Sequence, residues 1–219
     1  MATVIPLSDA SRRPTTFPFV TLTIIIVNVV VFIFELMNGE SWVERWSLIP
    51  AHVSAGHDLI TVFTAMFMHA SWSHIIGNMV FLWAFGPEIE DGMGPLRYMI
   101  FYLLGGVVAM LGQVAVDPHS TVPNLGASGA IAAVMGSFMI SFPADQIRSI
   151  LVIFVFARVT YISAGLLIGI WFLTQLFSLG TVAQSQSGGV AYVAHVAGFI
   201  YGLIFGRLFG AVRRPQELY

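Results

Sequence analysis

Three groups of polar residues interrupt the apolar stretches of this 219-residue chain. They centre on Ser128, on His195, and on the segment from His69 to Asn78. A serine hydroxyl beside a histidine imidazole can act as a nucleophile activated by a general base, if the two side chains come within about 3 Å of each other. The chain contains no cysteine and no lysine, so thiolate catalysis, disulfides, cysteine zinc sites and lysine nucleophiles are excluded.

Ser128 lies in the sequence PNLGASGAIAAVMG, where an irregular stretch meets an apolar one. Pro123 and Asn124 interrupt regular secondary structure, and Gly126, which has no side chain, permits other groups to approach the backbone closely. Ser128 is then predicted to be the N-cap of the following helix. The first amides of a helix have no internal partners, so they can bind an oxyanion beside this hydroxyl. The alternative is a packing surface of small residues with a capping serine.

His195 lies within the apolar sequence AYVAHVAGFIYG. Gly198, Gly202 and Gly206 form a small-xxx-small pattern, which predicts close packing of this helix against another. The segment around Gly136 is the expected partner. Such packing would bring the imidazole to the serine. The alternative is a structural histidine that makes a hydrogen bond inside the bundle.

The third group contains His69, His74 and Asn78. His74 and Asn78 are four residues apart, so both side chains project from one face of a helix. Two neutral donors on one face can stabilise negative charge that develops on a carbonyl oxygen. The alternative is a polar contact between helices.

The composition indicates that lipid surrounds the elements that carry these groups. Hydrophobic residues make up 57% of the chain and charged residues only 9%, whereas soluble domains have about 25% charged residues. The mean hydropathy is +0.86. The net charge of −2 and the lack of a basic tract exclude nucleic acid as a partner. We expect an all-α membrane protein with six transmembrane helices. The six apolar windows are Pro18–Met37, Ser73–Phe85, Tyr98–Val116, Ala127–Phe142, Ile162–Leu179 and Ala191–Val212.

One domain with two short tails is the expected organisation. Residues 1–16 and 213–219 form cytoplasmic tails, and residues 17–212 form the six-span unit. The outer segment between the first two spans, about Asn38–Trp72, is long and amphipathic, which suits elements in the outer leaflet. The apolar stretch Ile147–Phe156 is too short to cross a bilayer and is expected at the interface.

The arginines predict the orientation. Eight of the nine lie on one side if both termini are cytoplasmic, and only Arg45 is then outside. The apolar parts of the second and fourth spans are shorter than the roughly 20 residues of a full crossing. Their outer ends should therefore begin below the surface, around a water-accessible cavity that opens to the outer side.

The three groups occur in an order that resembles the rhomboid family of intramembrane serine proteases. The pattern is His-x4-His-x3-Asn, then Gly-x-Ser-Gly, then Ala-His-x2-Gly-x3-Gly. The matching residues are His69, His74, Asn78, Gly126, Ser128, Gly129, Ala194, His195, Gly198 and Gly202. The sequence EIEDGMG is similar to the family's acidic-glycine turn, with Glu90 at its recurrent glutamate. The resemblance covers about Phe63–Gly206.

The resemblance implies an endopeptidase that cleaves peptide bonds in or near transmembrane helices through an acyl-enzyme. Ser128 is then the nucleophile and His195 the general base, and His74, Asn78 and the Ser128 amide stabilise the oxyanion. His69 corresponds to a structural histidine in the outer loop. The supporting positions are Gly126, Gly129, Glu90, Gly198 and Gly202.

The resemblance also implies partners and a location. The partners are transmembrane substrate proteins, with small residues at the cleavage site, and the lipid bilayer; no cofactor and no metal is implied. The last three spans contain no Asp or Glu, so a Ser-His dyad is expected instead of a triad. A bacterial or archaeal cell membrane is expected, because the compact core shows no transit peptide.

Two positions depart from the family pattern. Ile60 and Thr61 stand where many members carry a Trp-Arg pair, and Ala132 stands where some carry a tyrosine stacked on the histidine. Another residue must therefore orient His195. The polar segment Ser178–Gly189 is expected to be a mobile cap over the site.

Three alternatives to a serine protease remain. A rhomboid-like protein can bind membrane helices without cutting them, although such relatives typically lose the serine or the histidine. A small channel or metal transporter could use His69, His74 and His195, but no carboxylate-lined span supports it. A membrane metalloprotease would need an HExxH motif, which the sequence lacks.

Overall fold

The computed structural model describes residues 2–182 and 192–211. The helices are α1 (Phe19–Asn38), α2 (Glu40–Trp46), α3 (Pro50–Ser54), α4 (Thr61–Thr64), α5 (Trp72–Met93), α6 (Pro95–Val116), α7 (Ser128–Ser141), α8 (Ala164–Val182) and α9 (Tyr192–Phe205), with a 3-10 turn at Ala65–Phe67. The strands are β1 (Ala2–Asp9), β2 (Gln146–Ile153) and β3 (Phe156–Ser163). The expected tail at 213–219 and residues 183–189 of the expected cap lie outside the described residues, and Ser178–Val182 belong to α8.

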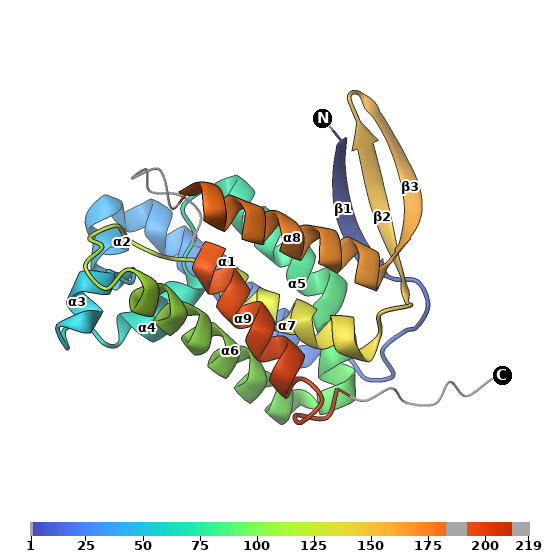
Figure 1. The fold of residues 1–219 in the computed structure, drawn as a ribbon, viewed down its shortest axis with the longest axis horizontal. Coiled ribbons are helices and arrows are strands. Elements are labelled where there is room, and N and C mark those ends of the chain that lie inside the picture. Colours follow the sequence, from blue (N-terminus) through green and yellow to red (C-terminus); the bar gives the residue numbers. More distant parts are fainter. Residues whose placement is uncertain (1, 183–191, 212–219) are drawn as a thin grey trace.

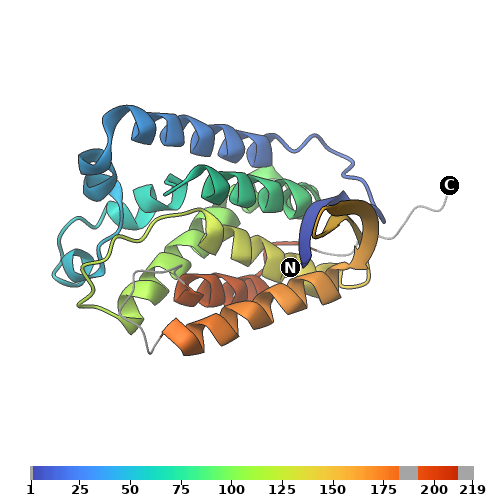
Figure 2. The same ribbon diagram turned by 90° about the horizontal axis from the view of Figure 1, so that it is seen from above.

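The long helices α1, α5, α6, α7, α8 and α9 form one bundle (Figures 1 and 2). α1, α6 and α8 begin at the end of the bundle that carries the strands, and α5, α7 and α9 finish there. Each of the six apolar windows overlaps one of these helices, so the predicted positions of the helices are confirmed, although not their exact ends.

Helix length separates these six helices into groups. Among the described residues, α1 and α6 are long and apolar enough to cross a membrane, whereas α7, α8 and α9 have shorter apolar lengths. The fourth helix is short, as expected, with 14 residues in α7. The apolar part of the second span is short as well, as predicted, but its helix is long: α5 has 22 residues, because Glu88, Glu90 and Asp91 continue it beyond that part.

A three-stranded antiparallel sheet corrects the expectation of an all-α protein. Its order is β1-β2-β3, so the N-terminal strand pairs with a hairpin between α7 and α8. Residues 2–9 of the expected N-terminal tail are β1, and the stretch Ile147–Phe156 is most of β2 and the turn into β3. The β-branched and aromatic residues of β2 and β3 favour a paired strand here once a partner strand is available.

Arg12 connects the sheet to the bundle. Its guanidinium pairs with the Asp145 carboxylate through Nε and, at 3.2 Å, through Nη2. The same guanidinium lies 4.2 Å from the centre of the Phe142 ring at the end of α7. Asp145 precedes β2, so this contact fixes the point where the chain leaves α7 for the sheet.

Glu90 holds the beginning of α1. Its carboxylate accepts hydrogen bonds from the Val20 and Thr21 amides, both at 2.8 Å, and from the Thr21 hydroxyl at 2.7 Å. These amides belong to the first turn of α1, where the backbone N–H groups have no acceptor within the helix. The expected acidic-glycine turn remains helical to Met93, and Gly94 makes the reversal into α6 with φ 79°.

The α7–α9 contact is the closest helix pairing at the centre of the bundle. A Cβ at Gly198 would collide with the carbonyl oxygen of Gly129, and a Cβ at Gly202 with that of Ala133. A Cβ at Gly136 would in turn collide with the backbone of α9. The predicted small-residue seam between these two helices is therefore confirmed.

Short helices fill the segment between α1 and α5. This segment contains α2, α3, α4 and the 3-10 turn. Leu48 forms an antiparallel bridge with Asn124, with N to O distances of 2.9 and 2.7 Å in the two directions. The bridge ties this segment to the loop that precedes α7.

Candidate active site

Ser128 and His195 meet at one end of the α7–α9 seam. The Nε2 atom of His195 lies 2.7 Å from the hydroxyl oxygen of Ser128. His195 is buried, with 7% of its surface exposed, and Ser128 is partly buried. The glycine contacts described above bring the two backbones close enough for these short side chains to touch.

The loop before α7 sets the position of Ser128. Gly126 has φ 137°, a conformation that side chains disfavour, and its amide donates to the Ala65 carbonyl oxygen at 2.9 Å. A Cβ at Gly126 would lie 2.9 Å from the His74 ring, so the position also lacks space. The predicted N-cap is wrong by one residue: Ala127 is the cap and Ser128 is the first residue of α7. The Ser128 amide is thus one of the helix's free N-terminal donors.

Gln175 on α8 holds the other nitrogen of the imidazole. Its side-chain oxygen lies 2.7 Å from His195 Nδ1. An amide oxygen can only accept, so Nδ1 carries the proton and Nε2 is left as the acceptor for the Ser128 hydroxyl. The ring of Trp171, also on α8, lies 5.8 Å from the imidazole, and that of Tyr192 lies 6.3 Å away. Gln175, Trp171 and Tyr192 therefore lie around the His195 ring, whereas Ala132 has no aromatic ring to stack on it.

His74 lies beside the serine. Its Nδ1 accepts a weak hydrogen bond from the Ala70 amide at 3.4 Å, which places the proton of the neutral ring on Nε2. Both side chains lie close to Gly126. A Cβ built on Gly126 would be 3.0 Å from His74 Nε2 and 3.5 Å from the Ser128 hydroxyl oxygen. The predicted donor is therefore next to the predicted nucleophile.

Asn78 and His69 form a buried pair behind His74. The Asn78 side-chain amide donates to His69 Nε2 at 2.9 Å. The His69 backbone amide donates to both oxygens of the Glu35 carboxylate, each at 3.1 Å. Glu35 is on the last turns of α1 and only 4% exposed. One Asn78 amide hydrogen is thus used on His69, and the second remains for another acceptor.

Sequence reasoning missed Gln175 and Glu35. Both are polar residues inside apolar stretches, which is the same signal that identified Ser128 and His195. Among residues 2–182 and 192–211, no group of three or more His, Cys, Asp or Glu side chains is arranged to hold a metal ion.

Comparison with known proteins identifies the family. Residues 56–212, well over half of the chain, match the rhomboid domain. The chain belongs to the rhomboid family. Members of this family are embedded in membranes and are generally intramembrane serine proteases. The match covers all of the candidate site except Glu35, which lies on α1.

Named relatives support the same family at lower coverage. The chain is 33% identical to the chloroplastic rhomboid-like protein 11 of Arabidopsis thaliana over 64% of its own length and 49% of that protein. It is 24% identical to the mitochondrial rhomboid protein 1 of Saccharomyces cerevisiae over 82% and 50%. It is 29% identical to a putative rhomboid protease of Bacillus subtilis over 35% and 38%. The rhomboid chain thus spans about half the length of the curated relatives it matches, or less. Several of these relatives are organellar by name, so they do not support the expected cell membrane.

Proposed function

We propose that this rhomboid protein is a serine endopeptidase that cleaves peptide bonds in or near the transmembrane helices of other membrane proteins. The 2.7 Å separation of Ser128 Oγ and His195 Nε2 carries the proposal, because proton transfer needs this distance. The hydrogen bond from His195 Nδ1 to Gln175 supports it further, since it leaves Nε2 free to accept a proton.

The reaction has two halves. Ser128 Oγ attacks the substrate carbonyl carbon while His195 Nε2 takes the hydroxyl proton. The C–N bond then breaks, the imidazolium gives this proton to the leaving amine, and the acyl group remains as an ester on Ser128. Water attacks the ester carbonyl and gives a proton to His195 Nε2. The C–O bond to Ser128 then breaks, the imidazolium returns this proton to Ser128 Oγ, and the carboxylic acid leaves.

The negative oxygen that forms in each half needs hydrogen-bond donors. The Ser128 amide at the beginning of α7 and the His74 Nε2–H group are the first proposed donors, and both lie close to the loop at Gly126 that precedes the nucleophile. Asn78 can donate its second amide hydrogen. Its first is bonded to His69, whose backbone amide is in turn bonded to Glu35. A helical substrate hides its carbonyls in hydrogen bonds, so it must unwind before it reaches these groups. Small residues at the cleavage site ease this approach.

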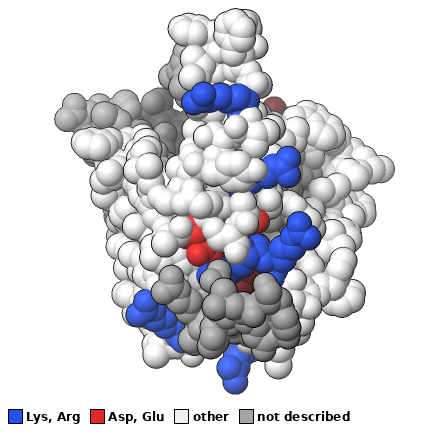
Figure 3. Space-filling view, turned by 90° about the vertical axis from the view of Figure 1, so that its right-hand side faces the viewer, with Lys and Arg blue, Asp and Glu red and all other residues white. Residues whose placement is uncertain are grey.

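We also propose six spans with both ends of the chain in the cytoplasm and the site opening outward. The alternating directions of the six long helices support this topology. The positive-inside rule supports the orientation, because Arg12, Arg97, Arg148, Arg158 and Arg207 all belong to the segments at the sheet end of the bundle, whereas Arg45 lies on α2. Figure 3 shows arginine side chains on the sheet end.

The test is cleavage of a single-span membrane protein by the reconstituted chain. Ser128→Ala and His195→Ala should each abolish cleavage, and Ser128→Ala should also abolish labelling by a fluorophosphonate, which reacts with activated serines. Ser73→Ala is the matched control, because this serine is exposed on the first turn of α5. Cleavage at the wild-type rate by either site variant would exclude the dyad.

A further inference from the structure

The sheet projects sideways from the helices. Its strands cross the helix axes at a steep angle, and the hairpin between β2 and β3 extends well beyond the bundle at the level of the helix ends (Figures 1 and 2). We refer to the outer half of the sheet, residues 150–159 with residues 2–5 of β1, as the wing. Because it extends along the end of a membrane-embedded bundle, the wing must meet the bilayer surface or the water directly next to it.

The tip of the wing is apolar and uncovered. Phe154, Val155 and Phe156 are 80%, 89% and 78% exposed. Phe154 also has φ 54°, where asparagine or glycine is the usual residue of a two-residue hairpin turn. Polar residues normally occupy such turns in water. The tip therefore combines the cost of an unusual backbone with the cost of exposing aromatic rings to water.

Both faces of the wing also carry apolar residues that are not fully buried. Residues that pair directly lie on one face, so Ile153 and Phe156 share one face, and Ile150 and Val159 share the other. Ile153 is 42% and Val159 is 51% exposed. An antiparallel sheet at a protein surface normally buries one face and presents polar residues on the other. This pattern is absent from the wing, which suits a sheet immersed in an apolar phase.

The exposed charges of the hairpin strands β2 and β3 are basic. Arg148 and Arg158 are both exposed, on opposite faces of the hairpin. Among the described residues of the three strands, the acidic one is Asp9, which is buried at the base. In the end-on view, the wing is a narrow projection with arginine across it (Figure 3). Guanidinium groups bind phosphate well, so this charge suits phospholipid headgroups.

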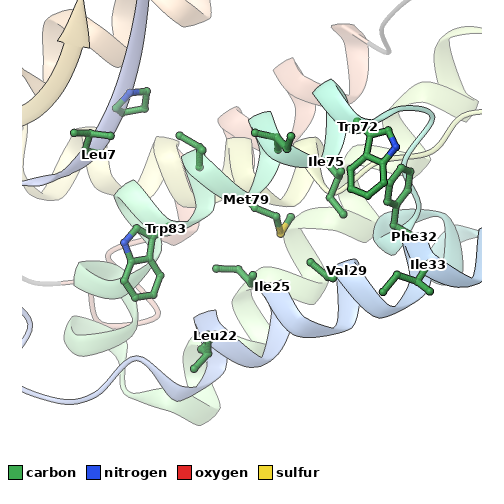
Figure 4. A pocket seen from close by; sticks show the side chains of 13 residues that line it. Leu7, Leu22, Ile25, Val29, Phe32, Ile33, Trp72, Ile75, Met79 and Trp83 are labelled. Carbon is green, nitrogen blue, oxygen red and sulfur yellow. The ribbon is translucent and has the colours of Figure 1, made fainter. Parts of the chain in front are cut away.

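The apolar surface of the helices continues into the wing. A groove of about 560 Å³ between α1 and α5 is lined by apolar side chains and ends at Pro6 and Leu7 of β1 (Figure 4). On α8, which directly follows β3, Leu166 and Ile170 are 57% and 55% exposed. Exposed apolar side chains therefore continue from these helices to the base of the wing.

We propose that the wing is an interfacial anchor that inserts its tip into the headgroup and upper acyl region of the bilayer in which the bundle sits, with Arg148 and Arg158 on lipid phosphates. The anchor does not depend on proteolytic activity. An insertion of about 5–10 Å is typical of interfacial elements.

The chain has no cysteine, so a single label reports the depth of the tip. Val155→Cys carries an environment-sensitive fluorophore in the full chain, reconstituted in phosphatidylcholine–phosphatidylglycerol vesicles. Nitroxide-labelled lipid should quench this fluorophore at least about twofold more than one at Ala144→Cys, an exposed site outside the strands, and aqueous iodide should quench it less.

A matched variant tests the apolar tip itself. The variant is Phe154→Asn with Phe156→Thr. Asparagine tolerates the φ of 54° at position 154, and threonine is a good strand residue at position 156, so the hairpin should be retained. In this background the label at position 155 should lose its lipid quenching and gain iodide quenching. Two results would overturn the proposal: equal iodide access at positions 155 and 144 in the wild-type background, or a label shielded from both quenchers with energy transfer between copies, which would indicate pairing of two chains through their edge strands.

Discussion

The imidazole of His195 has a partner on each nitrogen, Ser128 at Nε2 and Gln175 at Nδ1. In soluble serine proteases an aspartate takes the second place. An amide oxygen fixes the same tautomer without bringing a second charge into an apolar bundle, where a carboxylate is costly. Gln175 is therefore a positioning residue in the proposed mechanism, since it acts through His195.

Removal of the Gln175 oxygen should lower kcat and leave KM unchanged. In Gln175→Leu the imidazolium loses an acceptor worth about 1.5–3 kcal/mol, so kcat should fall about 10- to 100-fold. Gln175→Glu restores an acceptor of the same length and should recover most of the rate. Steady-state cleavage measures both constants, and the rate of fluorophosphonate labelling should fall in parallel.

Leu173→Ala is the control for Gln175, because Leu173 is exposed on the same helix. A wild-type kcat in Gln175→Leu would show that the hydrogen bond has no role in positioning. An equal loss in Gln175→Leu and Leu173→Ala would indicate a general effect on α8 instead.

At the scale of elements, the site depends on how closely α9 approaches α7. Gly198 and Gly202 place the α9 backbone against the carbonyls of Gly129 and Ala133. Ser128 and His195 are each carried on one of these two helices, so a change in their separation acts directly on the 2.7 Å contact.

Gly202→Ala should reduce both stability and activity. The added methyl group meets the Ala133 carbonyl oxygen, and such overpacking costs about 1–3 kcal/mol. Thermal unfolding in detergent should show a lower midpoint, and cleavage should slow. Gly77→Ala is the matched control on α5, where a new Cβ meets nothing within 4 Å. Equal midpoints for the two variants would contradict the seam.

The base of the sheet should respond to pH through Asp9. Burial raises the pKa of Asp9 from 3.8 to about 7, and the neighbouring Asp145 carboxylate adds to this shift. The folded chain then keeps a proton that the unfolded chain loses near pH 4, so this contribution to stability is complete below pH 4 and is lost as the pH rises to about 7. Hydrogen exchange of the β1 amides should be faster at pH 8 than at pH 5, after correction for intrinsic rates.

Asp9→Asn separates this effect from other titrations. The amide cannot ionise, so exchange in β1 should become nearly independent of pH over this range. Faster corrected exchange at pH 5 than at pH 8 in the wild-type chain would show that the sign is wrong.

For the molecule as a whole, the direction of the bundle decides on which side of the membrane the proposed cleavage would take place. Figure 1 places the sheet at one end and the short helices α2, α3 and α4 at the other. The loop before Ser128 is joined to the segment of short helices by the backbone hydrogen bonds between Leu48 and Asn124. The site therefore lies toward the end opposite the sheet, and the orientation of the bundle sets the side on which it opens.

Single cysteines test this orientation in membrane vesicles of known sidedness. Thr121→Cys lies in the exposed loop between α6 and α7, and Ala144→Cys is exposed between α7 and β2. A membrane-impermeant maleimide should label position 121 from the outer side and position 144 only after permeabilisation. The reverse pattern would invert the proposed topology, and labelling of both from one side would contradict a membrane-crossing α7.

The positions of the six long helices could be predicted from the sequence, because apolar windows, polar interruptions and glycine spacing are local signals. It also predicted Ser128, His195 and the small-residue seam between their helices. The boundaries were less accurate: α5 continues through a polar segment that no apolar window includes, and Ser128 follows the cap by one residue.

The sheet and the Gln175 partner of His195 could not be predicted from the sequence and became visible in the folded chain. The strand β2 is a short apolar run, which has no clear period, and its partner β1 comes from the opposite end of the chain. The Gln175–His195 contact depends on the rotation and depth of α8 against α9, which side-chain packing sets. Such long-range pairings arise from the packing of the whole bundle, whereas sequence patterns report what each segment prefers alone.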